Sequence, residues 1–167
     1  MTPAKLLVDA LSRVVENAEA VVGGLTEDEL AHRPTPDANP IGWLVWHLAR
    51  VQDDHVAHVA GSEQVWTAQG YAERAGLPLD ERDIGFGHTS EQVALVRLPG
   101  ELLLDYLRAV NARSVEYLRT LSEADLDRVV DRRWDPPVTL GVRLVSVVDD
   151  CAQHAGQASY VRGLLGR

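Results

Sequence analysis

Two metal-ligating side chains lie one helical turn apart near the C-terminus, in the stretch VVDDCAQHAGQASYVRGLL. Asp150 and His154 are four residues apart, so on a helix their side chains point to the same side, with Gln157 following three residues later. Such a pair can hold a cation because the backbone positions both donors before the ion arrives. The same pair is also a common surface ion pair, and a metal site therefore needs a third ligand.

Candidate third ligands lie in the stretch NPIGWLVWHLARVQDDHVAHVAG, residues 39–61. On a helix with about 100° per residue, His55 falls at the centre of the apolar stripe, whereas His47 lies on its edge. This geometry predicts that His55 is the more buried of the two, a hydrogen-bonded core histidine. The two lie about 12 Å apart along an unbroken helix, so they cannot both bind one ion. Helical position alone does not choose between His47 and His55.

Four long amphipathic helices are predicted to position these side chains. Thr2 serves as the expected N-cap of the first and Asn39 as that of the second. Long connections between the helices make the natural architecture an all-α four-helix bundle, formed as a single domain over residues 1–167. The predicted helices run from Pro3 to the Gly23-Gly24 pair, from Pro40 to about Gly61, from Pro99 to about Leu121, and from about Val142 to Leu165.

The longest connection, residues 62–87, is predicted to be an irregular excursion with weak helical character around EQVWTAQGYAERAG. A connection of this length in a compact domain is often functional. His88 follows it in GFGHTSEQ and is a candidate acid–base group, with loop hydrogen bonding as the alternative. Short capped turns are expected near Thr26, Ser90 and Ser122, and the only room for strands is near Val129 or Val138.

Composition excludes several classes of protein. The formal net charge of -9 opposes a nucleic-acid backbone, and no basic stripe offsets it. No apolar run approaches the roughly 18 residues needed to cross a bilayer, and no secretory leader is recognisable. The single cysteine, Cys151, rules out an internal disulfide and reads as a small core residue. We therefore expect a cytoplasmic protein that binds neither nucleic acid nor membrane.

The two helices that carry the candidate ligands resemble those of the DinB-like superfamily, which includes mycothiol-dependent maleylpyruvate isomerases and thiol S-transferases. The matching stretches are WLVWHLARVQDDH and DDCAQHAGQASYVRGLL. The resemblance implies a bundle of the DinB/YfiT-like type, with a divalent metal bound by His47, Asp150 and His154. It favours His47 over His55, which stays the alternative ligand. Many members carry histidine where this chain has Asp150, whereas the isomerase-like branch carries a carboxylate.

Two histidines and one carboxylate leave at least one coordination position open, as in a catalytic metal site. Zinc is the expected ion, and the ligand types also suit nickel or iron. The ion could bind a low-molecular-weight thiol as its thiolate, which would attack a small-molecule electrophile. The resemblance favours mycothiol as that thiol, which makes the protein a metal-dependent thiol S-transferase or isomerase. The alternatives are a non-catalytic, stress-related metal-binding bundle and a metal-dependent hydrolase.

Further residues near the candidate ligands have expected roles. Arg143 and Arg162 lie on the last helix and are candidates for contacts with anionic groups of a thiol or substrate. Gln157 can hydrogen-bond toward the site. Gly156 is expected to let a neighbouring helix approach closely. Ordinary packing is the alternative for both Gly156 and Gln157. Related bundles often dimerise, so a homodimer is a further expectation.

Overall fold

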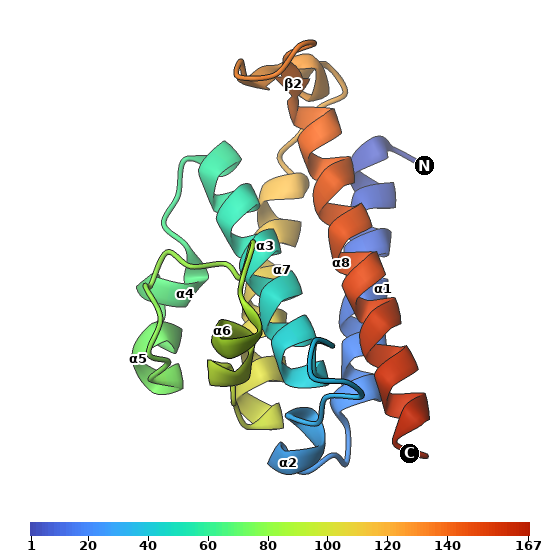
Figure 1. The fold of residues 1–167 in the computed structure, drawn as a ribbon. Helices are drawn as coiled ribbons and strands as arrows, with labels where there is room; N and C mark the ends of the chain where they lie inside the picture. Colours follow the sequence, from blue (N-terminus) through green and yellow to red (C-terminus); the bar gives the residue numbers. More distant parts are fainter.

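Four long helices form the bundle in the computed structural model, which describes residues 1–167 (Figure 1). Helix α3 packs against α8 and α7, and α1 packs against the same two helices, so α1 and α3 lie on opposite corners. The predicted all-α four-helix bundle is confirmed. The long helices are α1 (Pro3–Val22), α3 (Ile41–Ala60), α7 (Gly100–Leu118) and α8 (Leu140–Leu164).

The helix ends follow local capping rules, with two departures from the sequence-based expectations. Thr2 caps α1 by accepting a hydrogen bond from the Lys5 amide. Helix α3 begins at Ile41, and Pro40, not Asn39, occupies its N-cap, because the backbone of Pro40 is extended with ψ 161° and cannot be a first helical residue. Helix α8 begins two residues earlier than expected, because the Thr139 side chain caps it.

Short elements fill the connections. The two antiparallel strands lie just before α8, at the top of Figure 1, and coincide with the two places where the sequence left room for them. The weak helical character expected in the excursion corresponds to two short helices. The short elements are α2 (Glu27–Leu30), α4 (Val65–Ala68), α5 (Tyr71–Ala75), α6 (Ser90–Leu95), the 3-10 helix η1 (Ala124–Asp127), β1 (Val129–Asp131) and β2 (Val138–Thr139).

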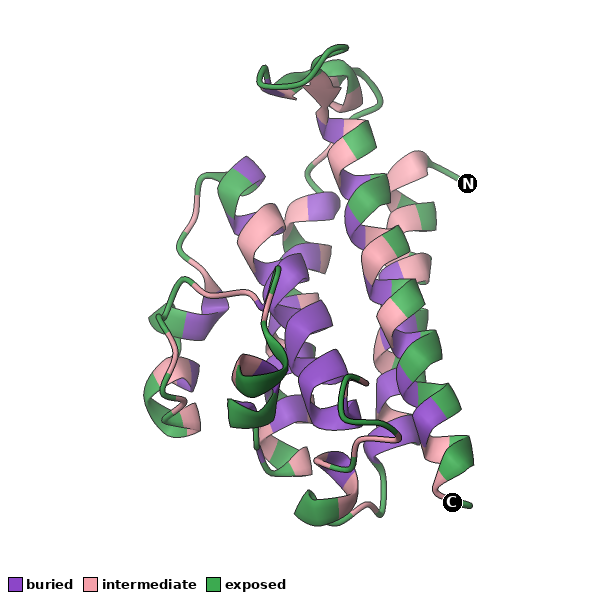
Figure 2. Ribbon diagram, viewed as in Figure 1, coloured by how far each residue is buried: buried purple, intermediate pink, exposed green.

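A fully buried arginine fastens the 62–87 excursion to α3. The Arg50 guanidinium donates to the carbonyls of Glu81 and Asp83 at 3.0 and 3.1 Å. It also donates to Gln64 Oε1 at 2.8 Å and to the Tyr106 hydroxyl of α7 at 3.2 Å. The excursion thereby covers a side of α3 that the bundle leaves open, and residues 41–53 of α3 are all buried (Figure 2).

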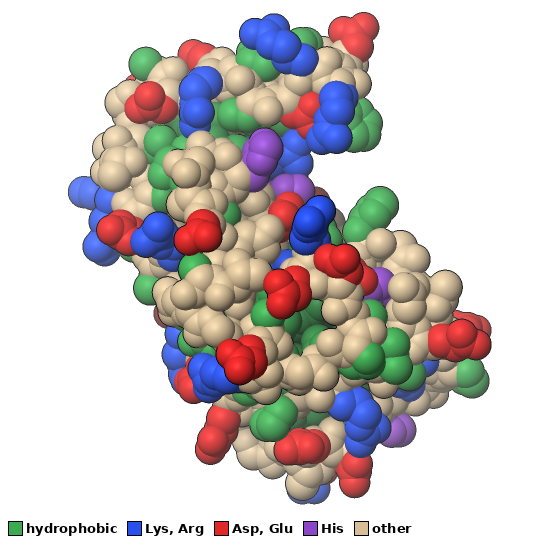
Figure 3. Space-filling model, turned by 90° about the vertical axis from the view of Figure 1, so that its left-hand side faces the viewer, with side chains coloured by type: hydrophobic (Ala, Val, Ile, Leu, Met, Phe, Trp, Pro, Cys, Tyr) green, Lys and Arg blue, Asp and Glu red, His purple; other side chains and the backbone are tan.

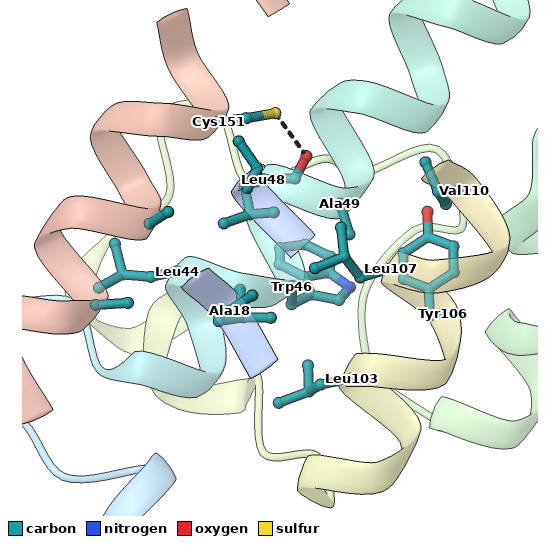
Figure 4. Packing of buried hydrophobic residues seen from close by; sticks show 14 of the residues in the cluster. Ala18, Leu44, Trp46, Leu48, Ala49, Leu103, Tyr106, Leu107, Val110 and Cys151 are labelled. Carbon is teal, nitrogen blue, oxygen red and sulfur yellow. Dashed lines mark hydrogen bonds between the residues drawn. The ribbon is translucent and has the colours of Figure 1, made fainter. Parts of the chain in front are cut away.

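The hydrophobic core lies between the four long helices. Trp46, Leu48, Leu107 and Tyr106 come together from α3 and α7 (Figure 4). Cys151 of α8 is fully buried, and its thiol lies 3.4 Å from the Leu48 carbonyl. The core therefore ties α3 to α8 along the length where the candidate ligands lie.

None of the helices is both long and apolar enough to cross a membrane.

Candidate metal centre

Three side chains from α3 and α8 meet on one side of the α3–α8 interface. His47, Asp150 and His154 each offer one ligand atom, and these atoms all lie within 4.8 Å of one another. The Nε2 of His154 lies 3.6 Å from Oδ1 of Asp150. The rings of His47 and His154 lie 4.7 Å apart between centroids and cross at 76°. The structure thus brings together the three residues that the resemblance selected.

Hydrogen bonds fix the orientation of both histidines. The Nδ1 of His47 donates to the Ile84 carbonyl, and the Nδ1 of His154 donates to Oε1 of Gln157 at 3.0 Å. An imidazole that donates through Nδ1 keeps its Nε2 lone pair for a metal, which is how such partners usually orient ligating histidines. Gln157 therefore contacts the site as the sequence suggested.

The electrostatics of the cluster also suit a cation. The Oδ2 of Asp150 is buried and has no hydrogen-bond partner, an arrangement that folded proteins seldom leave uncompensated. Burial lowers the pKa of His47, which favours the neutral imidazole that a metal requires. Two imidazole nitrogens and a carboxylate oxygen fit zinc, nickel or iron better than calcium or magnesium.

A series of contacts through Trp43, His88 and Asp83 links His47 to the 62–87 excursion. The Trp43 ring stacks on the His47 ring, with centroids 4.6 Å apart and planes 12° apart. The Trp43 indole donates to Nδ1 of His88 at 3.1 Å, and Nε2 of His88 donates to Oδ2 of Asp83 at 2.9 Å. Burial raises the pKa of Asp83, but the hydrogen bonds from His88 and the Gly85 amide lower it by more, which favours the carboxylate.

These contacts hold the His88 side chain between Trp43 and Asp83. Both of its ring nitrogens are occupied within the protein, and its side chain is almost fully buried. The acid–base role suggested by the sequence gains no support from this arrangement. Sequence reasoning missed the supporting positions Trp43, Asp83 and Ile84. The length and the glycines of the excursion were the only signals that it served the site.

The prediction that His55 is more buried than His47 is wrong. His47 is 5% exposed, whereas the side chain of His55 is 29% exposed and lies 3.5 Å from Asp54. A single apolar stripe could not reveal this order, because the excursion covers α3 beside His47 and leaves the helix end near His55 uncovered. His55 is not part of the cluster of three ligand atoms.

The two candidate arginines are engaged elsewhere. Arg162 donates to the carbonyls of Val21 and Gly23 and so satisfies the C-terminal end of α1. Arg143 donates to Oδ2 of Asp131 in β1 at 3.2 Å. Its charge also helps to lower the pKa of His55, after the larger effect of burial. Arg143 therefore lies toward the end of the α3–α8 interface that is nearest the β1–β2 hairpin, which we call the hairpin end. Arg162 lies toward the other end.

The surface is hollowed beneath the part of the molecule that is uppermost in Figure 3. Histidine side chains gather at this notch, with basic and acidic side chains around them.

The fold and the arrangement of ligands on α3 and α8 define a four-helix bundle of the DinB/YfiT-like type. The family model described as Mycothiol-S-transferase matches residues 6–166, and the chain belongs to this family. The structure is also similar to a solved structure, "Crystal structure of the conserved protein of locus from Enterococcus faecalis", with a TM-score of 0.94 and 36% sequence identity. That match covers 100% of this chain and 99% of the other. No curated protein matches.

Proposed function

We propose that the protein is a metal-dependent thiol S-transferase that uses mycothiol as its thiol. The observation that carries this proposal is the convergence of one ligand atom from each of His47, Asp150 and His154, together with the buried Oδ2 of Asp150 that has no hydrogen-bond partner. Membership of the Mycothiol-S-transferase family supports the choice of thiol. Zinc is the proposed ion, held by His47, Asp150 and His154, with ligand positions left over for a cosubstrate.

A bound divalent ion would supply Lewis acidity that lowers the pKa of a thiol and so provides a thiolate at neutral pH. The residues of the chain do the rest. Ile84 and Gln157 hold the two imidazoles by their Nδ1 atoms, and Trp43 keeps the His47 ring in place. In the transfer, the thiol proton passes to solvent and the sulfur forms a bond to an electrophilic carbon of the second substrate. The leaving group departs with the electron pair of the broken bond.

The thiol must come from a second molecule, because the cysteine of the chain itself is sequestered. Cys151 is fully buried in the core, and burial raises the pKa of its thiol far above the usual range. Its sulfur faces the Leu48 carbonyl of α3. Cys151 cannot act as the transferred or attacking sulfur without unfolding α8 from α3.

Metal binding is tested first, with protein prepared without an affinity-tag metal and titrated with zinc. The variants His47→Ala, Asp150→Asn and His154→Ala should each lose at least about tenfold in zinc affinity. Two matched controls should keep wild-type affinity. His58→Ala removes an exposed histidine from the same helix, and Asp149→Asn alters the neighbouring carboxylate, which is exposed and bonded to Gln153. Equal zinc affinity in wild type and all three cluster variants would overturn the metal site.

Transfer is tested by incubating the zinc-loaded protein with mycothiol and a monohalobimane, whose conjugate is fluorescent. We expect conjugate formation above the uncatalysed rate, dependent on zinc and lost in His154→Ala but kept in His58→Ala. Zinc binding without any acceleration of conjugation, across several electrophiles, would refute the S-transferase and favour a bundle that only binds metal. Hydrolysis of the electrophile without consumption of thiol would favour a hydrolase.

A further inference from the structure

A cavity of about 640 Å³ lies one helical turn from both histidines of the candidate metal centre. Leu44 of α3, three residues before His47, forms part of its wall. Gln157 of α8, three residues after His154, forms another part, and this is the side chain that bonds to Nδ1 of His154. Asn39 of the loop before α3 also lines the cavity. The cavity therefore continues the α3–α8 interface from the metal centre toward the C-terminus.

Gly156 lines this cavity and has no packing role. A Cβ added to it would meet no atom within 4 Å, so the expected close approach of a neighbouring helix is wrong. Glycine destabilises a helix interior relative to alanine, and Gly156 lies in the middle of α8. Gly156 therefore borders the cavity without a side chain, two residues after His154.

The lining of the cavity indicates what it holds. None of the lining side chains carries a charge. Half of the lining residues are hydrophobic, and the 70% exposed Tyr160 and the amides of Asn39 and Gln157 lie with them along the wall. A mixed lining of this kind suits a neutral ligand that has both C–H faces and hydroxyl groups, because apolar and aromatic side chains can pack on the C–H faces and the amides can bond the hydroxyls. The volume is within the range of small-molecule sites.

Ionisable side chains lie at the other end of the α3–α8 interface, nearest the hairpin. Toward the hairpin, Asp54, His55 and Arg143 interact electrostatically. An uncharged group is therefore better accommodated at the Gly156 end than at the hairpin end, where an anionic or strongly polar group would meet charged partners.

We propose that the cavity beside Gly156 binds the neutral, hydroxyl-rich body of the thiol cosubstrate, with the sulfur directed along α8 toward His154. This inference rests on the proposed function for the identity of the thiol. It assigns the thiol body to the Gly156 end of the α3–α8 interface.

The test measures binding of S-methyl mycothiol, which cannot form a thiolate, by calorimetry on the zinc-loaded protein. Gly156→Leu should place a side chain in the cavity and raise the Kd of this probe at least about tenfold. Gly163→Leu is the matched control, because Gly163 is also a glycine of α8 with no atom within 4 Å of an added Cβ, yet it does not line the cavity. Its Kd should equal that of wild type. Urea unfolding should show that neither variant is less stable than wild type.

The outcomes separate this inference from the proposed function. An unchanged Kd in Gly156→Leu, or no binding of the probe to wild type, would overturn the inference even if S-transfer is observed. In Gly156→Leu, an unchanged KM for mycothiol together with a raised KM for the electrophile would also overturn the inference, and would place the electrophile in the cavity. Cavity-dependent binding of the probe without any S-transfer would support the inference while refuting the transferase.

Discussion

A Cβ atom on Gly85 would lie 2.9 Å from Nδ1 of His47, closer than real Cβ contacts allow. Gly85 also has φ +90°, a conformation that side chains other than glycine rarely adopt. We predict that Gly85→Ala displaces the excursion and weakens the hydrogen bond between His47 and the Ile84 carbonyl. Zinc affinity should fall about 10- to 100-fold, the usual effect of losing an orienting partner, as measured by competition with a chromophoric chelator.

Gly87→Ala is the matched control for this prediction. Gly87 also has a positive φ, +75°, but an added Cβ would meet no atom within 4 Å. Both variants should lose stability on the order of 1–3 kcal/mol from backbone strain, whereas only Gly85→Ala should lose zinc affinity. Equal zinc affinities in the two variants would show that the excursion does not orient His47.

Arg50→Met tests whether the buried guanidinium holds the excursion in place. The substitution keeps much of the side-chain volume but leaves the carbonyls of Glu81 and Asp83 without their donor. It also removes the cation that lies 3.7 Å from the buried Asp53 carboxylate. The free energy of unfolding should fall by roughly 3–5 kcal/mol, the usual cost of removing one partner of a buried ion pair.

The control for Arg50 is an arginine in an exposed ion pair. Arg13 lies on the surface of α1 beside Asp9, so Arg13→Met should change the free energy of unfolding by at most about 1 kcal/mol in urea titrations. Similar losses in the two variants would mean that the Arg50 network contributes little to stability.

The sequence predicted the bundle because four helices carry strong periodic apolar patterns and recognisable ends. It placed Asp150 and His154 together because their spacing is local to one helix. It ranked His47 and His55 wrongly because burial of α3 depends on the excursion, whose path is set by contacts between distant residues such as Arg50 and Asp83. Trp43 could not be assigned to the site for the same reason: its partner, His88, is 45 residues away.

The reactivity of Cys151 tests how tightly α8 is packed on α3. The thiol is fully buried and its pKa is raised by burial, so the thiolate that reacts with alkylating agents is suppressed. In native protein at pH 8, we expect alkylation by iodoacetamide to proceed at least about a hundredfold more slowly than in urea-unfolded protein. Rapid modification under native conditions, detected by mass spectrometry, would contradict the packing of this helix pair.

The stability of the metal-free protein should decline as the pH falls from 7 to 5. Burial lowers the pKa of both His47 and His55, so the unfolded chain, in which histidine titrates near about 6.5, takes up protons before the folded chain does. The unfolded state binds more protons throughout this window, and the free energy of unfolding therefore rises with pH.

Replacing one of these histidines isolates its share of the pH dependence. His55→Gln removes a titrating group that is not among the three clustered ligand residues, so the decline in stability between pH 7 and 5 should be shallower than in wild type. Urea unfolding of both proteins at matched pH values, in the presence of a chelator, measures the difference. Parallel curves would mean that His55 titrates alike in the folded and unfolded chains, and that the α3 end near the hairpin is more open to water than its burial indicates.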